Sequence, residues 1–261
     1  MMEEKKIIVS LTSFPARINI VHLAINRIFK NDVQPDMIVL YLARPQFPNE
    51  LDNVSGELQQ MVKENNRFEI RFVERDTRPY KKLVHALRDF PNDIVITIDD
   101  DTLYRRNLIK QLVASHKKNP NSIIVRRARF ITFNKKGSLK PYRKWPLNGL
   151  LNHCRMIGKP NFRNFIIGAA LYPPYCFCDE VFNEQVYMDI CETTDDIWFW
   201  AMAVKNGTKI ASSRPYAWQR KIKGTQKVAL RNVNYRTQND INMQRVLEKY
   251  PSVAGKIRNQ Y

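Results

Sequence analysis

The chain has 261 residues, of which 44% are hydrophobic and 26% are charged. This length can bury the core of one large α/β domain, and this composition excludes a wholly disordered chain. A formal net charge of +18, from 43 basic and 25 acidic residues, points to an anionic partner: nucleic acid, an anionic membrane surface or a phosphorylated substrate.

Apolar runs typical of strands alternate with amphipathic segments through the first half of the chain. The strand-like runs are 7–12, 37–42, 68–73, 94–98 and 122–125. Between them, apolar residues recur three and four positions apart in 19–31, 55–65, 80–90 and 107–119. Strict alternation predicts crossover connections, and therefore a mostly parallel sheet with helices on both faces.

Three consecutive carboxylates, Asp99, Asp100 and Asp101, end the fourth strand-like run. Adjacent carboxylates repel one another unless a cation lies between them, and ligands of open sheets bind beyond the carboxyl ends of the strands. Carboxylate oxygens suit Mg²⁺ or Mn²⁺ and leave room for phosphate oxygens and water. The alternative is that one carboxylate caps the helix that begins near Arg105, for which a single Asp would suffice.

The second half of the chain is less regular and starts with a basic block. From 102 to 178 there are sixteen Lys and Arg but no Asp or Glu. This block suits an anionic partner or a solvated basic surface. It contains no recognised nucleic-acid motif, so a nucleic-acid partner is not expected.

A second acidic pair, Asp195 and Asp196, begins a predicted helix over 194–207 that Gly207 ends. Either carboxylate is a candidate general base that takes a proton from a hydroxyl. The alternative is a purely structural cap formed by Thr194 and Asp195. The aromatic residues that follow, 198–200, are interpreted as core, and a further amphipathic helix is predicted over 240–250.

Other sequence features limit where the protein is located in the cell and which cofactors it uses. The N-terminal stretch lacks the layout of a signal peptide, so a cytoplasmic protein is expected, with peripheral attachment to the inner face of the cell membrane left open. The apolar region 165–178 is shorter than the ~20 residues that span a bilayer. The four cysteines are expected to be free thiols, because the zinc set His153, Cys154, Cys176 and Cys178 fits no common spacing. Neither a P-loop nor a GxGxxG motif occurs.

Several motifs, taken in their order along the chain, resemble those of nucleotide-sugar glycosyltransferases of the GT-A fold. They are VSLTSFPARI, RPYKKLVHAL, PNDIVITIDDDTLY, GAALYPP, TTDDIWFWAMAVKNG, GTQKVAL and QND. The similarity is to family 2-like enzymes of bacterial capsule and lipopolysaccharide gene clusters. It implies one GT-A domain over 1–261, with a Rossmann-like nucleotide-binding half, 1–126, and a less regular acceptor-binding half, 127–261.

The resemblance also implies a role for each matching residue. The nucleotide site would be lined by Thr12, Ser13, Pro15 and Arg17, with Lys81 or Lys82 near the nucleotide or its phosphates and Asp100 beside them. Asp99 and Asp101 would form a DxD-like motif for ribose, Mn²⁺ or Mg²⁺ and diphosphate, with Asp101 the more direct ligand. Gly168, Ala169 and Ala170 would border the acceptor and donor sugars. Asp196, or else Asp195, would be the base of an inverting displacement.

The resemblance therefore implies a metal-dependent, hexosyltransferase-type enzyme of polysaccharide biosynthesis. It would transfer a sugar from a nucleotide diphosphate sugar, a UDP-sugar, to a hydroxyl of a glycan or lipid-diphosphate-linked acceptor. The QxxRW motif of processive synthases is absent, which favours addition of a single sugar. Two alternatives stay open: a metal-dependent nucleic-acid-processing enzyme, and a non-catalytic glycan- or lipid-binding module in which both acidic clusters are helix caps.

Overall fold

The computed structural model describes residues 5–147, 159–213, 220–228 and 237–259. The chain forms two compact units, of which the first contains 1–111 and 217–228 and the second contains 112–216 and 229–261. The boundary between these units lies inside helix α4 (Leu108–Lys118), and the expected division into functional halves after residue 126 stays a prediction. The first unit also includes a segment from late in the chain, which the sequence did not predict. The expectation of a single domain stays a prediction.

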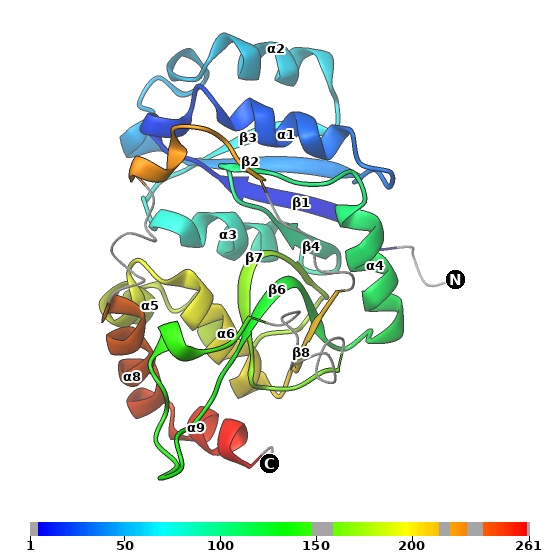
Figure 1. Ribbon diagram of the computed structural model, residues 1–261. Coiled ribbons are helices and arrows are strands. Elements are labelled where there is room, and N and C mark those ends of the chain that lie inside the picture. The colour runs from blue at the N-terminus through cyan, green and yellow to red at the C-terminus, as the bar shows by residue number, and fades with distance from the viewer. Residues whose placement is uncertain (1–4, 148–158, 214–219, 229–236, 260–261) are drawn as a thin grey trace. The chain divides into compact units, whose positions relative to one another are not determined.

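Four parallel strands form the centre of the first unit (Figure 1). They are β1 (Ile7–Thr12), β2 (Met37–Ala43), β3 (Phe68–Val73) and β4 (Ile94–Thr97). Within this unit β1 pairs with both β2 and β4, and β3 pairs with β2. The strands β1, β2 and β4 are almost continuously apolar and buried, as expected where helices cover both faces of a parallel sheet.

Three helices of the first unit connect these strands: α1 (Val21–Phe29), α2 (Gly56–Glu64) and α3 (Lys81–Asp89). Helix α3 packs against β1, β2 and β4, and Figure 1 shows α1 on the opposite face of these strands. The start of α2 is set by Ser55, whose hydroxyl accepts a hydrogen bond from the backbone N–H of Leu58. The predicted parallel sheet with helices on both faces is confirmed.

A short antiparallel pair extends the first unit beyond β4. Strand β5 (Thr102–Leu103) pairs with β9 (Arg220–Lys221), and Thr102 lies opposite Lys221. The backbone N–H of Ile222 donates to the carbonyl of Asp101 at 2.8 Å. We call residues 220–228 the return segment, because it brings a late part of the chain to the end of β4.

The second unit contains three strands: β6 (Ile123–Phe130), β7 (Asn164–Tyr172) and β8 (Ile210–Ser212). Strand β6 is antiparallel to β7 and parallel to β8. The register shifts between Val125 and Arg127, where two residues of β7 face one of β6. Gly168 lies at this shift with φ +67°, the left-handed backbone that a β-bulge of this kind requires and that glycine adopts most easily.

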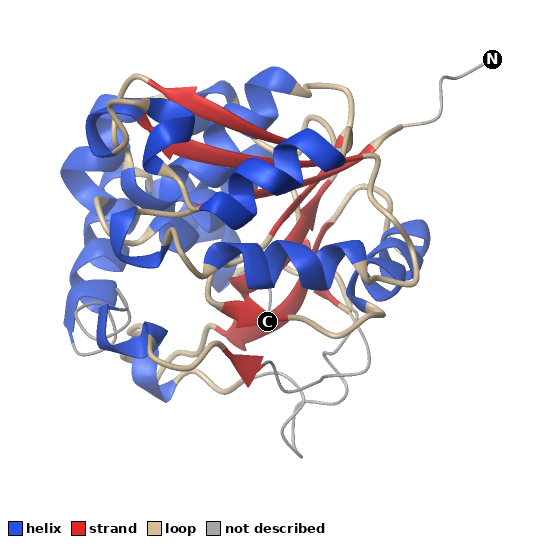
Figure 2. Cartoon of the chain, turned by 90° about the horizontal axis from the view of Figure 1, so that it is seen from above, coloured by secondary structure: helices blue, strands red, loops and turns tan. Residues whose placement is uncertain are grey.

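Four helices complete the described part of the second unit: α5 (Glu184–Cys191), α6 (Asp195–Asn206), α8 (Asn239–Lys249) and α9 (Pro251–Arg258). Figure 2 distinguishes these helices from the strands by colour. Helix α6 packs against β7, α5, α8 and α9, which explains why it is apolar on nearly every side. The indole N–H groups of Trp198 and Trp200 donate to backbone carbonyls at 3.1 and 2.9 Å, so both rings are core, as predicted.

In the part of the chain that the structure describes, Cys176, Cys178 and Cys191 form no disulfide bond, whereas His153 and Cys154 of the candidate zinc set lie outside it. Within the described ranges, the helices lack the combination of length and apolarity that crossing a membrane requires.

Candidate active site

The acidic triplet, Asp99 to Asp101, follows β4 directly and lies at the carboxyl end of that strand, as predicted. Like Asp101, Asp100 is buried. Its Oδ1 atom lies 2.6 Å from Nη1 of Arg17, and its Oδ2 atom accepts a hydrogen bond from the hydroxyl of Ser13 at 2.8 Å. Both partners come from the turn after β1, where Pro15–Arg17 form a short 3-10 helix. Burial nevertheless outweighs the guanidinium, so the pKa of Asp100 is raised from its ordinary value.

Asp101 uses both carboxylate oxygens. Oδ1 accepts hydrogen bonds from Nζ of Lys221 at 2.5 Å and from the hydroxyl of Thr102 at 2.9 Å. Oδ2 accepts from the side-chain amide of Gln226 at 3.1 Å and lies 3.3 Å from Nη1 of Arg17. The carboxylate of Asp101 is therefore enclosed by donors, two of which belong to the return segment.

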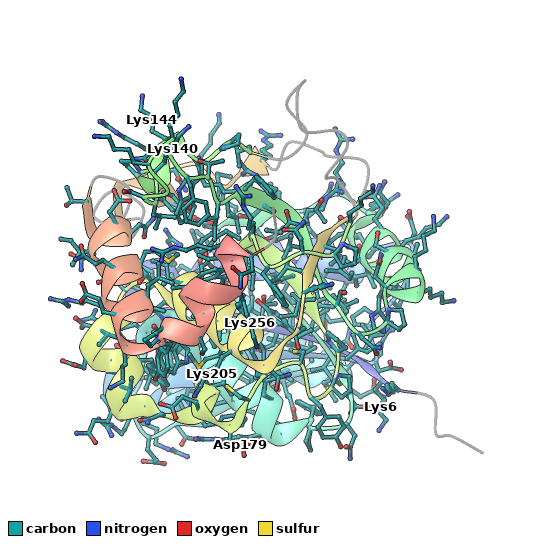
Figure 3. The ribbon with its side chains drawn as sticks, turned by 90° about the horizontal axis from the view of Figure 1, so that it is seen from below. Lys6, Lys140, Lys144, Asp179, Lys205 and Lys256 are labelled. Atoms are coloured by element: carbon teal, nitrogen blue, oxygen red, sulfur yellow. The ribbon has the colours of Figure 1, made fainter. Side chains whose placement is uncertain are left out.

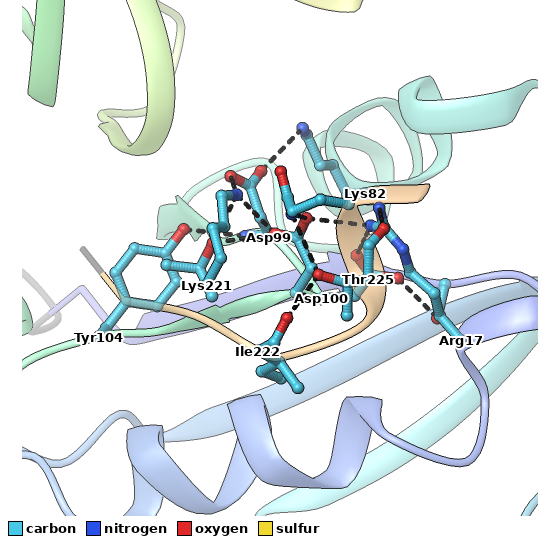
Figure 4. Close-up of polar contacts among 12 residues, drawn as sticks. Arg17, Lys82, Asp99, Asp100, Tyr104, Lys221, Ile222 and Thr225 are labelled. Carbon is cyan, nitrogen blue, oxygen red and sulfur yellow. Dashed lines mark hydrogen bonds and ion pairs between the residues drawn. The ribbon is translucent and has the colours of Figure 1, made fainter. Parts of the chain in front are cut away.

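Asp99 is the most open of the three carboxylates, with 29% of its side chain exposed. Its oxygens lie 3.6 Å from Nζ of Lys221 and 3.9 Å from Nζ of Lys82. Burial alone would raise its pKa, but these two ammonium groups lower it below the ordinary value. The same pairing raises the pKa of Lys221 against the opposite effect of burial. Figure 4 shows Lys221 and Lys82 approaching Asp99 from different elements.

The return segment is attached to the site through its backbone as well. Nη2 of Arg17 donates to the carbonyl of Thr225 at 3.0 Å, and the hydroxyl of Thr225 donates to the carbonyl of Ile222 at 2.8 Å (Figure 4). Gly224 supplies the turn between them with φ +85°. Arg17 thus ties together the turn after β1, the triplet and the return segment.

Most of the nucleotide-site residues predicted in the first unit lie at this cluster. Ser13, Arg17 and Lys82 contact the triplet, and Pro15 begins the 3-10 helix that carries Arg17. Thr12 lies just before them, with its hydroxyl bonded to the carbonyl of Tyr41 at 2.8 Å.

The two adjacent lysines at the start of α3 point to different partners. The ammonium of Lys81 is buried and pairs with Asp76, and burial lowers its pKa. Nζ of Lys82 lies beside Asp99. Of the two lysines that the resemblance offered, Lys82 is therefore the one at the triplet.

The other predicted site residues belong to the second unit. Gly168, Ala169 and Ala170 lie in β7 at the bulge, and Asp195 and Asp196 form the first turn of α6. Asp195 is buried, whereas Asp196 is partly exposed.

The structural alternative for this acidic pair assigned a capping role to Thr194 and Asp195. The side chain of Thr194 makes no capping hydrogen bond to the helix, and its hydroxyl accepts one from the amide of Asn242 at 2.8 Å instead. Capping by Thr194 therefore does not account for this cluster.

Sequence reasoning missed three side chains that hydrogen-bond to the triplet: Tyr104, Lys221 and Gln226. The hydroxyl of Tyr104 accepts from the backbone N–H of Asp99 at 3.0 Å. Lys221 and Gln226 follow Asp101 by 120 and 125 positions, so neither periodicity nor local spacing could connect them with it.

A family model described as Glycosyl transferase family 2 matches residues 50–177. A search of curated proteins found no match.

Several solved structures resemble the chain. The 4-diphosphocytidyl-2C-methyl-D-erythritol synthase of Anaerococcus prevotii DSM 20548 has 12% identity and a TM-score of 0.50 over 89% of this chain and 96% of that chain. The S. aureus protein TarS 1-349 has 12% identity and a TM-score of 0.50 over 96% and 74%. The same TarS fragment in complex with UDP has 17% identity and a TM-score of 0.48 over 82% and 59%. The predicted fold class and the predicted enzyme class, a glycosyltransferase, are confirmed.

Proposed function

We propose that the chain transfers a sugar from a nucleotide diphosphate donor, with UDP as the nucleotide, to a hydroxyl of a glycan or lipid-diphosphate-linked acceptor. The observation that carries this proposal is the cluster at the end of β4, where Asp99 and Asp101 meet Lys82, Lys221 and Arg17 in a chain that matches a glycosyltransferase family. Carboxylates there can bind a cation, and basic side chains can bind phosphate oxygens.

A divalent cation fits the donor set of this cluster. Asp99, Asp101 and Thr102 present hard oxygen ligands, and the space between the two carboxylates already accepts the positive charge of Lys221. The described residues contain no group of three or more His, Cys, Asp or Glu that could hold a metal, so phosphate oxygens and water would complete the coordination, as is usual for Mg²⁺. A bound Mn²⁺ or Mg²⁺ would act as a Lewis acid toward the departing diphosphate.

The side chains of the first unit would orient the donor. Lys82 lies at the start of α3 beside Asp99, where its ammonium can contact a phosphate oxygen. Arg17 and Ser13 hold Asp100 in place, so they position the triplet. Because these contacts already fix the triplet, it needs little reorganisation when the donor binds.

In the second unit, Asp196 would take the proton of the acceptor hydroxyl in an inverting displacement. We prefer it to Asp195 because Asp195 is buried and Asp196 is partly exposed. Gly168, Ala169 and Ala170 would border the sugars, since glycine and alanine leave room beside the backbone.

The acceptor proposal draws on one exposed basic region of the second unit. The basic segment 135–144 presents five exposed cationic side chains: Lys135, Lys136, Lys140, Arg143 and Lys144. Figure 3 shows Lys140 and Lys144 projecting away from the ribbon. We propose that this segment attracts an anionic lipid surface at the inner face of the cell membrane, where a lipid-diphosphate-linked acceptor for capsule or lipopolysaccharide synthesis would be presented.

Calorimetric titration of UDP, with and without Mn²⁺, into the wild type and Asp101→Asn tests the proposed function. We expect UDP to bind with Mn²⁺ and the variant to lose that binding, because one of the two shared carboxylates becomes neutral. Thermal unfolding of both proteins separates loss of a ligand from loss of the fold. Failure of the wild type to bind UDP under either condition would refute the proposal.

A further inference from the structure

The charges at the acidic triplet are balanced by the chain itself. Among the described residues, the cationic groups within 4 Å of these carboxylates belong to Arg17, Lys82 and Lys221. Three carboxylates thus face three cationic side chains. A diphosphate that enters this cluster brings additional negative charge, so either further positive charge must enter with it or an internal pair must open.

Lys221 occupies the central position among these pairs. Its Nζ atom lies 2.5 Å from Oδ1 of Asp101, 2.8 Å from the hydroxyl of Thr102 and 3.6 Å from Oδ2 of Asp99. One ammonium therefore contacts the oxygens that a shared divalent cation would use as ligands. The ammonium and such a cation cannot occupy this space together, because both the volume and the repulsion of like charges forbid it.

The other two cations are placed differently. Arg17 is buried and is bonded to Asp100 and to the carbonyl of Thr225, so it is part of the framework. Lys82 lies at the side of Asp99, at 3.9 Å. The side chain of Lys221 is 38% exposed and has a flexible four-carbon stem, so its ammonium can leave the carboxylates without a change in the backbone.

We propose that Lys221 is an internal cation that competes with a divalent cation for the space between Asp99 and Asp101, and that it moves from these carboxylates to the donor's diphosphate when a divalent cation enters. In this exchange the cation takes over Asp99 and Asp101, and the displaced ammonium balances the phosphate charge. The part that concerns the diphosphate rests on the proposed function, whereas the part that concerns the cation does not.

The exchange has a thermodynamic consequence. A divalent cation alone must displace Lys221 without a new anion for the ammonium, so it binds weakly. Nucleotide diphosphate supplies that anion, so cation and nucleotide strengthen each other's binding by the same factor. Lys221 is then the residue through which this coupling acts.

Titration of Mn²⁺ into the full chain without nucleotide, followed by the electron paramagnetic resonance signal of free Mn²⁺, tests the cation half. Lys221→Met is expected to bind Mn²⁺ at least about tenfold more tightly than the wild type, because a competing unit charge a few ångströms away is gone. Lys221→Arg keeps the charge and is expected to bind Mn²⁺ as weakly as the wild type. The matched control is Lys223→Met, which removes the same charge from an exposed position of the return segment.

Each outcome of the Mn²⁺ titration either supports or overturns the proposed role of Lys221. Tighter binding in Lys221→Met alone supports the proposal. Unchanged binding in that variant, or an equal gain in Lys223→Met, overturns it, because the effect would then be absent or due to net charge. Lys221→Gln serves as a second variant if Lys221→Met does not fold, as judged by thermal unfolding.

The nucleotide half is measured by titration of UDP at saturating Mn²⁺. Lys221→Met is expected to bind UDP about tenfold more weakly than the wild type, opposite in sign to its effect on Mn²⁺ alone. UDP binding that is unchanged or stronger in this variant overturns the proposed movement to the diphosphate. If the wild type binds Mn²⁺ but ignores UDP, the proposed function fails while the cation titration still decides the role of Lys221.

Discussion

Replacement of Arg17 by methionine tests how strongly the Arg17 guanidinium stabilises the buried carboxylate of Asp100. In the wild type the side chains of Arg17 and Asp100 are only 10% and 8% exposed, and they lie 2.6 Å apart. Methionine fills much of the same volume but leaves the hydroxyl of Ser13 as the remaining described side-chain donor to Asp100. Breaking a buried ion pair by removing one partner costs about 3–5 kcal/mol, so we expect a loss of this size in the free energy of unfolding near pH 8.

The pH dependence of this loss tests the reasoning more stringently than its size at pH 8 does. Burial already raises the pKa of Asp100, and removal of the guanidinium raises it further. A raised folded-state pKa means that the folded protein binds the proton more tightly than the unfolded chain does. Its stability therefore increases as the pH falls through the folded pKa, until the unfolded value near 4 is reached. The deficit of Arg17→Met relative to the wild type should shrink between pH 8 and pH 5.

Urea unfolding followed by the fluorescence of the four tryptophans gives the free energy at each pH. The double variant Arg17→Met/Asp100→Asn is the control, since it removes the uncompensated charge and should recover most of the loss at pH 8. An Arg17→Met protein as stable as the wild type at pH 8 would refute the reasoning. A deficit that grows as the pH falls would refute it equally.

Three further predictions concern other parts of the chain. Gly207→Ala should lower the free energy of unfolding by about 1 kcal/mol, because Gly207 ends α6 at φ +87°, a backbone conformation that alanine adopts only with strain. Gly56→Ala, in the first turn of α2, should not destabilise the protein and serves as the control. Urea unfolding compares the two variants. Asp196→Asn should lower kcat by about 10²–10⁴-fold while leaving UDP binding intact, measured by donor turnover and calorimetry; an active variant would exclude it as the base. Replacing the five cations of the basic segment 135–144 with glutamine should weaken binding to anionic vesicles by about 1 kcal/mol per residue. Cosedimentation with vesicles measures this binding, and neutral vesicles are the control. Unchanged sedimentation with anionic vesicles would contradict the membrane proposal.

Local pattern was sufficient for strands β1 to β4 of the first unit and for the helices that connect them. Runs 7–12 and 68–73 coincide with β1 and β3, and the predicted boundaries of α2 and α3 differ from those in the structure by about one residue. In these segments apolar periodicity, the Ser55 cap and short connections all favour the same structure, so propensity and tertiary packing agree.

The second unit was harder to predict. Strand β7 is a continuous apolar run whose bulge at Gly168 interrupts its pairing with β6, and it was not assigned as a strand. The predicted run 122–125 continues to Phe130 in β6, because pairing with β7 extends it through Arg127 and Arg129. Such pairing is a long-range interaction that no local window contains.

The sequence by itself determined that three carboxylates end a strand at the ligand-binding edge of a parallel sheet, with Ser13 and Arg17 in the loop that reaches the same edge. These follow from the order of elements, since loops after parallel strands gather at one edge. Only the tertiary structure decided which cations balance the triplet. Lys82 rather than Lys81 lies beside it, and Lys221 arrives from 120 residues away. Charge pairing depends on distance in space, and the fold alone converts a separation along the chain into a contact.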